Sequence, residues 1–397
     1  MKNFVFISPN FPNNYWHFCR ELKDNGLNVL GIGDCPYFDM PEHLRSALTD
    51  YYKVTSLENY EEVYRAIAFY IHKYGRIDWL ESNNEYWLEK DAHLRTEYSI
   101  KTGFHDEDMP HVKFKSLMKE NYAKAGIPFA RYHMVDNYEN CRAFIDEVGY
   151  PVVAKPDNGV GASDTHKIKN DEDLRHFFDT KLNITYIMEE YIFGEVHTYD
   201  CIVNSKGEPM FETGNVTIGS LMDIVNNSDN CALYIRAQLP EALLKAGRAT
   251  VKAFGVKSRF CHLEFFQLSK DQHIGKKGEY VALEVNMRPS GGISPTMMNY
   301  ANGTDVYKIW ADMIAFDKTE KKCVDKKICV FTGRRDGHKF VMNGDQIRQK
   351  YAANLKEEGP VDGALRMTMA DYMYLATFDT EEEAREYVED VFAEVHE

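Results

Sequence analysis

The sequence predicts an α/β protein made of several domains, and three observations support this. The chain has 397 residues, which is too long for one ordinary hydrophobic core. It opens with alternating strand and helix patterns, which indicate an open parallel sheet. Farther along, strands follow one another through short polar turns, as in antiparallel hairpins. With 44% hydrophobic and 13% aromatic residues, the chain can fill such interiors.

The first hundred residues carry the parallel pattern. A buried strand is predicted at 2–8 (KNFVFIS), a helix at 15–26 and a second strand at 27–33. A helix over 57–74 and a strand over 77–82 continue the alternation. We therefore expect a small open α/β domain at this end of the chain.

A second pattern begins after a helix predicted over 112–126, which Gly126 closes. The predicted elements that follow are a strand with a Gly-rich turn at 150–168, a helix at 171–181, a strand, turn and hairpin at 185–216, a helix at 240–254, strands at 259–268 and 279–289, and an α/β tail from 330. Because hairpins and helices do not alternate regularly here, we expect α+β lobes. We expect regions 1–105, 106–192, 193–325 and 326–397.

Charge and composition exclude several classes of protein. The chain has 47 basic and 62 acidic residues, a net charge of −15, which argues against nucleic-acid or anionic-membrane partners. No apolar run is long enough to span a membrane, and the first residues do not form a signal peptide. Eight scattered cysteines without a C-x-x-C pair indicate reduced thiols in a cytoplasmic protein.

The two strands at 259–268 and 279–289 carry a row of polar side chains. Glu284, Asn286 and Arg288 share one face of the second strand because strand side chains alternate. His262 and Glu264 share a face of the first strand. If Glu264 lies opposite Glu284, a divalent cation would offset the repulsion. The alternative is an exposed hairpin with ordinary surface charges.

Two further segments have the composition of a nucleotide site. Lys155 ends a strand before a loop that contains Gly159, Gly161 and Ser163, where backbone amides can approach phosphate oxygens. The alternative for this loop is a plain hairpin tip. The segment 189–192 (EEYI) can form a purine pocket, with polar edges from Glu189 and the Glu190 backbone and an apolar wall from Ile192. The alternative is an ordinary turn with surface acids.

These segments, in this order, resemble the ATP-grasp superfamily over roughly residues 110–315. The matching features are Lys115 on a helix, Lys155 before a Gly-rich loop, an E-x-x-I segment at 189–192, Glu264 on one strand and E-x-N-x-R at 284–288 on the next. The N-terminal α/β region is similar to the domain that precedes the ATP-grasp domain. The sequence is most similar in kind to carboxylate–amine ligases related to D-alanine–D-alanine ligase and biotin carboxylase.

The resemblance implies a set of ligands and site residues. Lys115 and Lys155 would contact ATP phosphates, and Arg288 would act on the transferring phosphoryl group or hold the acid. The remaining roles would be the lid loop (Gly159, Gly161, Ser163), the adenine pocket (Glu189, Glu190, Ile192) and Mg²⁺ or Mn²⁺ ligands (Glu264, Glu284, Asn286).

Two positions depart from the family pattern. The acid expected at the ribose lies one position early, at Glu195, and Val196 stands in its place. His262 stands where D-alanine–D-alanine ligases have arginine, so it either donates to an anionic intermediate or packs on the sheet.

The implied activity is an ADP-forming ligase. A small carboxylate, such as an amino acid or peptide-like acid, would be activated as an acyl phosphate and joined to an amine, in a monomer or a homodimer. The alternatives are a nucleotide-binding protein without ligase activity and a small-molecule kinase of the same fold. Glu85 is a candidate substrate contact or structural cap, and Arg236 a candidate carboxylate anchor.

Overall fold

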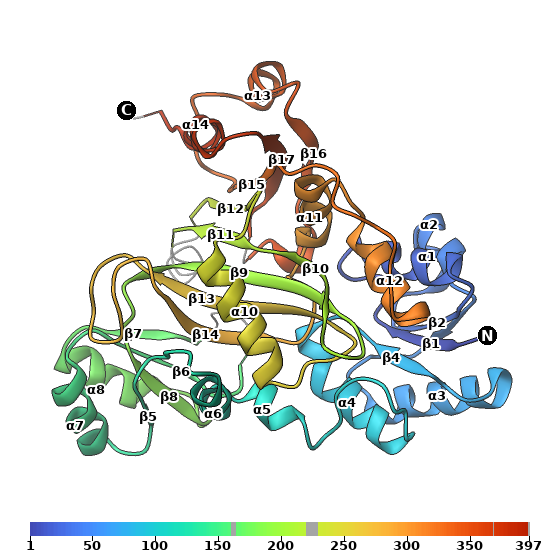
Figure 1. Cartoon of the computed structure of the whole chain (residues 1–397), viewed down its shortest axis with the longest axis horizontal. Coiled ribbons are helices and arrows are strands. Elements are labelled where there is room, and N and C mark those ends of the chain that lie inside the picture. Colours follow the sequence, from blue (N-terminus) through green and yellow to red (C-terminus); the bar gives the residue numbers. More distant parts are fainter. Residues whose placement is uncertain (160–163, 220–228, 368, 396–397) are drawn as a thin grey trace.

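The structure is a computed structural model that describes residues 1–159, 164–219, 229–367 and 369–395. The described strands form three sheets, which confirms the predicted mixture of parallel and antiparallel α/β regions (Figure 1). One sheet is near the N-terminus, one lies in a small lobe, and the largest continues to the C-terminal region.

The N-terminal sheet is parallel and has the strand order β3-β2-β1-β4. Its central strand β1 is buried along its whole length, as a parallel strand covered on both faces should be. The elements are β1 (Asn3–Ile7), α1 (Trp16–Asp24), β2 (Asn28–Gly33), α2 (Glu42–Ala47), β3 (Asp50–Lys53), α3 (Tyr60–Tyr74), β4 (Trp79–Glu81) and α4 (Leu88–Glu97). The βαβ opening predicted from the sequence is therefore confirmed.

The small lobe holds an antiparallel sheet of order β5-β8-β6-β7. Its apolar residues form a core of their own between the sheet and two helices. The elements of this part are α5 (Met109–Lys113), α6 (Lys115–Ala125), β5 (Tyr132–Met134), α7 (Tyr138–Val148), β6 (Val152–Pro156), β7 (His166–Ile168), α8 (Asp171–Thr180) and β8 (Tyr186–Glu190).

The helix predicted over 112–126 is broken at Phe114, so the single-helix prediction was wrong. Phe114 has an extended backbone, and α6 starts at Lys115. Asp157 explains the break, because its side chain accepts hydrogen bonds from the N–H and hydroxyl of Ser116 at 2.8 and 2.7 Å. The Lys115 N–H donates to the Asp157 carbonyl. A residue more than forty positions away thus caps this helix.

The large sheet has the order β14-β13-β9-β11-β12-β15-β17-β16, with β10 paired to β9. Its strands are β9 (Gly194–Val203), β10 (Pro209–Thr213), β11 (Asn215–Ile218), β12 (Cys231–Ile235), β13 (Arg259–Leu268), β14 (Tyr280–Asn286), β15 (Ile328–Arg334), β16 (Leu355–Pro360) and β17 (Tyr372–Phe378). The C-terminal strands therefore extend the sheet of the preceding region, through the pairing of β12 with β15.

Helices cover this sheet. They are α10 (Glu241–Ala253), α11 (Ser294–Asn302), α12 (Val306–Phe316), α13 (Gly344–Lys350) and α14 (Glu381–Phe392). In Figure 1, α10 lies over β9, β13 and β14, and its buried Leu243 and Val251 pack in the same apolar cluster as those strands. The α11 helix was not predicted from the sequence.

The N-terminal sheet is joined to the rest of the chain through α12. Trp310 is 2% exposed and packs edge-on against Phe4 of β1, with ring centroids 5.5 Å apart. It also packs against Phe18 of α1. Trp310 thus packs α12 against the N-terminal domain, beside which this helix lies in Figure 1.

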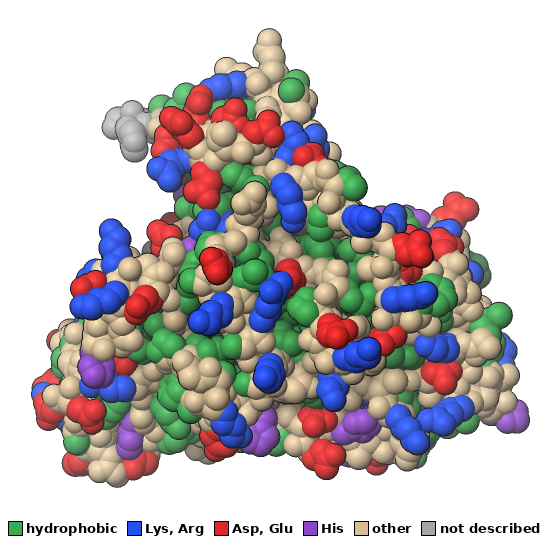
Figure 2. All heavy atoms as spheres, viewed as in Figure 1, with side chains coloured by type: hydrophobic (Ala, Val, Ile, Leu, Met, Phe, Trp, Pro, Cys, Tyr) green, Lys and Arg blue, Asp and Glu red, His purple; other side chains and the backbone are tan. Residues whose placement is uncertain are grey.

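The surface carries both signs of charge. On the face seen in Figure 2, lysine and arginine side chains alternate with aspartate and glutamate, without one extended basic area. None of the described helices combines the length and the apolar character that crossing a bilayer requires.

Candidate active site

The polar hairpin has the register that the sequence analysis required. In the antiparallel pair β13–β14, Glu264 lies opposite Glu284, and His262 lies opposite Asn286. Burial raises the pKa of Glu284 above its usual value; Lys115 opposes this shift and Glu264 adds to it. Two facing carboxylates in a largely buried place are unfavourable unless cations accompany them.

A buried histidine supplies part of that compensation. His262 lies between two carboxylates, with Nδ1 2.7 Å from Asp200 and Nε2 3.1 Å from Glu264. Burial opposes its charge, but Asp200 and Glu264 raise the pKa of His262 to about 9, so it is cationic at neutral pH. Thr198 donates to Asp200 and holds that carboxylate. His262 therefore contacts a candidate metal ligand and does more than pack on the sheet.

Lys115 supplies a second positive charge beside these carboxylates. Its Nζ lies 3.2 Å from Glu284 and donates to the Gly159 carbonyl at 3.2 Å. Because Lys115 is the first residue of α6, the cap by Asp157 fixes where its side chain starts. We call Asp200, His262, Glu264, Glu284 and Lys115 the acidic cluster, because it has three carboxylates and two cations.

A second group has the opposite balance. Glu189 of β8 lies between Lys155 of β6 at 2.7 Å and Lys119 of α6 at 2.5 Å. Burial would raise the pKa of Glu189, but the two lysines outweigh it and hold the pKa at about 2. Burial also disfavours the charge of Lys155, yet Glu189, Glu284 and Glu264 raise its pKa. We call Lys119, Lys155 and Glu189 the basic cluster.

The other residues predicted to contact adenine and ribose lie apart from one another. Ile192 is buried in a small apolar cluster with Ala130, Leu268 and Val281. Glu190 points to the other face of β8 and pairs with Arg131 at 2.7 Å. The side chain of Glu195 is 69% exposed, with His197 at 3.7 Å. Gly161 and Ser163 lie outside the described residues.

Arg288 extends from the end of β14 toward the N-terminal sheet. It donates to the Asn286 amide oxygen at 3.3 Å and to the Pro289 carbonyl at 2.8 Å. Its Nε lies 3.3 Å from Glu85, which follows β4. Lys113 donates to the other oxygen of Glu85 at 2.7 Å. The candidate Glu85 therefore lies at the site and contacts Arg288.

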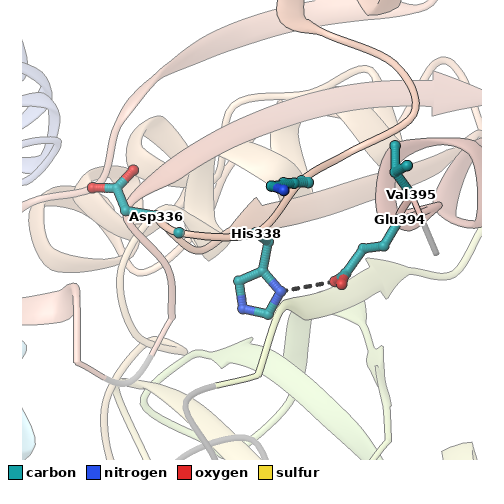
Figure 3. A pocket seen from close by; sticks show the side chains of 6 residues that line it. Asp336, His338, Glu394 and Val395 are labelled. Carbon is teal, nitrogen blue, oxygen red and sulfur yellow. Dashed lines mark hydrogen bonds and ion pairs between the residues drawn. The ribbon is translucent and has the colours of Figure 1, made fainter. Parts of the chain in front are cut away.

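Arg236 lies elsewhere in the structure. It follows β12 and pairs with Glu381 of α14 at 3.1 Å. We expect Arg236 to belong to a specificity loop at 219–236, of which residues 220–228 lie outside the described residues. A separate surface hollow is lined by Asp336, His338 and Glu394, and its His338–Glu394 contact measures 2.8 Å (Figure 3). None of the predicted site residues lines that hollow.

The two clusters have the donors that a magnesium nucleotide requires. Two carboxylates and an amide, from Glu264, Glu284 and Asn286, are the oxygen ligands that Mg²⁺ prefers. The excess negative charge of the acidic cluster fits a divalent cation. The excess positive charge of the basic cluster fits phosphate oxygens. The clusters adjoin, since Glu264 and Glu284 both shift the pKa of Lys155.

Sequence reasoning missed three of these residues. Lys119 is four positions after Lys115 and therefore shares its helix face, which was an available signal. Asp200 is opposite His262 in the β9–β13 pairing, which no local pattern indicates. Lys113 precedes the break at Phe114 and was assigned to the same helix as Lys115.

Comparisons with known proteins found relatives in sequence and in structure. No family model matches the sequence. The chain is 23% identical over 304 residues to the L-arginine-specific L-amino acid ligase of Bacillus subtilis, across 74% of this chain and 70% of that protein. The structure of an L-amino acid ligase from Bacillus licheniformis matches with a TM-score of 0.74 and 16% identity, across 100% of this chain and 99% of that one.

A third similar protein is the biotin carboxylase domain of a 2-oxoglutarate carboxylase from Hydrogenobacter thermophilus. Its structure, a dimer in complex with MgADP, ADP and bicarbonate, matches with a TM-score of 0.69 and 14% identity. The match covers 97% of this chain and 88% of that one. The chain therefore shares its fold with ATP-grasp ligases and is similar in sequence to an L-amino acid ligase.

Proposed function

We propose that the chain is an ATP-dependent, ADP-forming ligase that joins a small carboxylic acid to an amine. One observation carries this proposal: Glu264 faces Glu284 across β13–β14, and Lys115 connects Glu284 to the Gly159 carbonyl of the Gly-rich loop. The sequence similarity to an L-amino acid ligase supports an amino acid or a peptide-like acid as the substrate.

The reaction has two steps, and the chain's residues orient groups and balance charge. An oxygen of the acid attacks the γ-phosphorus of ATP, and the bond to ADP breaks to leave an acyl phosphate. The amine then attacks the acyl carbon, loses a proton, and phosphate leaves with the electrons of the broken C–O bond. Lys115, Lys155 and Arg288 share the negative charge that passes between these groups.

Each part of the site has a proposed role. Glu264, Glu284 and Asn286 would hold Mg²⁺, or Mn²⁺, which prefers the same oxygen donors, and the bound ion would neutralise phosphate charge. Lys119 joins Lys155 as a cation near the phosphates. We retain as proposals the lid roles of Gly159, Gly161 and Ser163, the adenine contacts of Glu189, Glu190 and Ile192, and a ribose contact by Glu195.

ADP release tests the proposal. Purified protein with ATP and Mg²⁺ is incubated with pairs drawn from the twenty amino acids, and nucleotides and products are separated by chromatography. We expect ADP, phosphate and a dipeptide in equal amounts for at least one pair. AMP as the nucleotide product would contradict the acyl-phosphate route. A phosphorylated product formed without an amine would identify a kinase instead.

Three further proposals concern the whole chain. A cytoplasmic location is supported by eight cysteines that are all free. A homodimer is supported by the dimer in the Hydrogenobacter structure, and sedimentation of the purified protein would test it. The divisions at 105 and 192 are supported by the separate N-terminal and small-lobe sheets, whereas the large sheet continues across 325 through the β12–β15 pair; limited proteolysis would test the boundaries.

A further inference from the structure

A buried carboxylate connects the N-terminal sheet to Arg288. Glu85 lies just beyond β4, at the carboxyl edge of the parallel sheet, where open α/β sheets bind ligands. Its side chain is 9% exposed, and those of Lys113 and Arg288 are 4% and 16% exposed. Three segments far apart in the sequence therefore meet at one carboxylate.

The hydrogen bonds of Glu85 are incomplete. Oε1 accepts from Lys113, but no described group directs a hydrogen bond at the buried Oε2, although Arg288 Nε lies 3.3 Å away. A carboxylate that served the fold alone would have donors at both oxygens, as Glu81 of β4 has from Arg95 and Arg259.

Arg288 retains donors for a ligand. A guanidinium has five N–H groups. Nε faces Glu85, while one N–H of each terminal nitrogen goes to Pro289 and Asn286. In the described part of the chain, each terminal nitrogen thus keeps one N–H. Two such donors suit the two oxygens of a carboxylate.

We propose that Glu85 is a positioning residue for Arg288 and so defines the subsite of the acid substrate. By holding Nε, it turns the two remaining N–H groups toward a carboxylate bound between the end of β14 and the carboxyl edge of the N-terminal sheet. Lys113 and Arg288 supply the positive charge that attracts that carboxylate. This inference rests on the proposed ligase function.

Glu81, the last residue of β4 and four positions before Glu85, is a matched control. It pairs with Arg95 at 2.8 Å and Arg259 at 2.5 Å, and all three side chains are 4% exposed or less. Glu81 makes no direct contact with Arg288, although its partner Arg259 also donates to the carbonyl of the neighbouring Met287 at 3.1 Å. Glu81 thus represents a buried acid whose pairs do not include Arg288.

The test is a double-mutant cycle with R288K, measured with the amino-acid pair that gives the fastest ADP release. We expect E85Q to lower kcat/KM for the acid about 10- to 100-fold, because a small displacement of Arg288 misplaces the acid. The KM for ATP should change less than about threefold. In the R288K background E85Q should cause no further loss, because Glu85 acts through Arg288.

The control and the alternatives give different results. E81Q should lower the midpoint of thermal unfolding, and its effect on activity should be the same in both backgrounds. An E85Q loss that multiplies with that of R288K, or a change below twofold, would overturn the inference. If E85Q does not fold, E85D replaces it, and its loss should also vanish with R288K. No ADP from the wild-type chain with any pair would instead overturn the proposed function.

Discussion

The acidic and basic clusters adjoin in one site but are balanced in opposite ways. The acidic cluster sets Asp200, Glu264 and Glu284 against His262 and Lys115. The basic cluster sets Lys119 and Lys155 against Glu189 alone. Each is one charge away from neutrality, and the deviations have opposite signs. The comparison teaches that the site is completed by a cation on one side and by anionic oxygens on the other.

The largest expected effect is a loss of turnover when a residue of the acidic cluster is replaced. E284Q should reduce ADP formation by at least about 10³-fold, because a bound cation contributes several kcal/mol to stabilising the phosphoryl transfer. Folding should survive, since the change removes one of two facing charges. Single-turnover kinetics and circular dichroism measure the two quantities. The exposed Glu279, which precedes the same strand, gives the control E279Q, and equal activity of the two variants would refute the cation site.

The next effect is on stability, from the basic side. E189Q should lower the free energy of unfolding by about 3–5 kcal/mol, because it removes the carboxylate that pairs directly with two buried lysines. Urea denaturation measures this value. The adjacent Glu190 pairs on the other face of β8 with Arg131, whose side chain is 31% exposed and can be solvated when the carboxylate is lost, so E190Q should cost less, about 1 kcal/mol. Equal losses of unfolding free energy in E189Q and E190Q would show that Glu189 stabilises the fold no more than an ordinary ion pair does.

Glu189 should also make the free energy of unfolding depend on pH. The folded pKa of Glu189 is about 2, below the ordinary value of 4.5, so its stabilisation is complete above pH 4.5 and declines as the pH falls toward 2. The difference in unfolding free energy between wild type and E189Q should therefore shrink with acidification. Over the whole interval, the pKa shift corresponds to roughly 3 kcal/mol. Urea titrations between pH 6 and 3.5 would detect the trend, and a constant difference would contradict it.

The smallest expected effect is the stabilisation of the fold by Mg²⁺, and it distinguishes the acidic cluster from the basic cluster. With 10 mM Mg²⁺ and a dissociation constant near 1 mM, wild type should gain about 1.4 kcal/mol of stability. The gain should persist in E189Q and vanish in E284Q, because only the latter loses a ligand. Thermal unfolding with and without MgCl₂, against an equal ionic strength of NaCl, measures it. A gain retained by E284Q would place the cation elsewhere.

The hairpin was the most predictable part of the site. Alternation placed Glu284, Asn286 and Arg288 on one face, and the apolar residues between them fixed which face was buried. The parallel opening was predictable for a related reason, because strand and helix periods differ clearly. The facing of Glu264 and Glu284 followed from the hairpin and is confirmed.

The remaining contacts depend on tertiary structure. Asp157 breaks the helix before Lys115 by hydrogen bonds to Ser116, and propensity could not reveal that cap. Lys119 meets Glu189 only because α6 packs across β8. Glu85 meets Arg288 across two domains. Such pairs have no local period, so a single sequence carries little trace of them.

The pairing of β12 with β15 has a consequence for shortening the chain. Residues beyond 325 do not form an appendage, because their strands continue the sheet that includes β13 and β14. A chain that stops near 325 would leave β12 as a bare edge with five unmatched residues from Cys231 to Ile235. Open edges of this kind recruit other strands, so the shortened protein should self-associate into insoluble material.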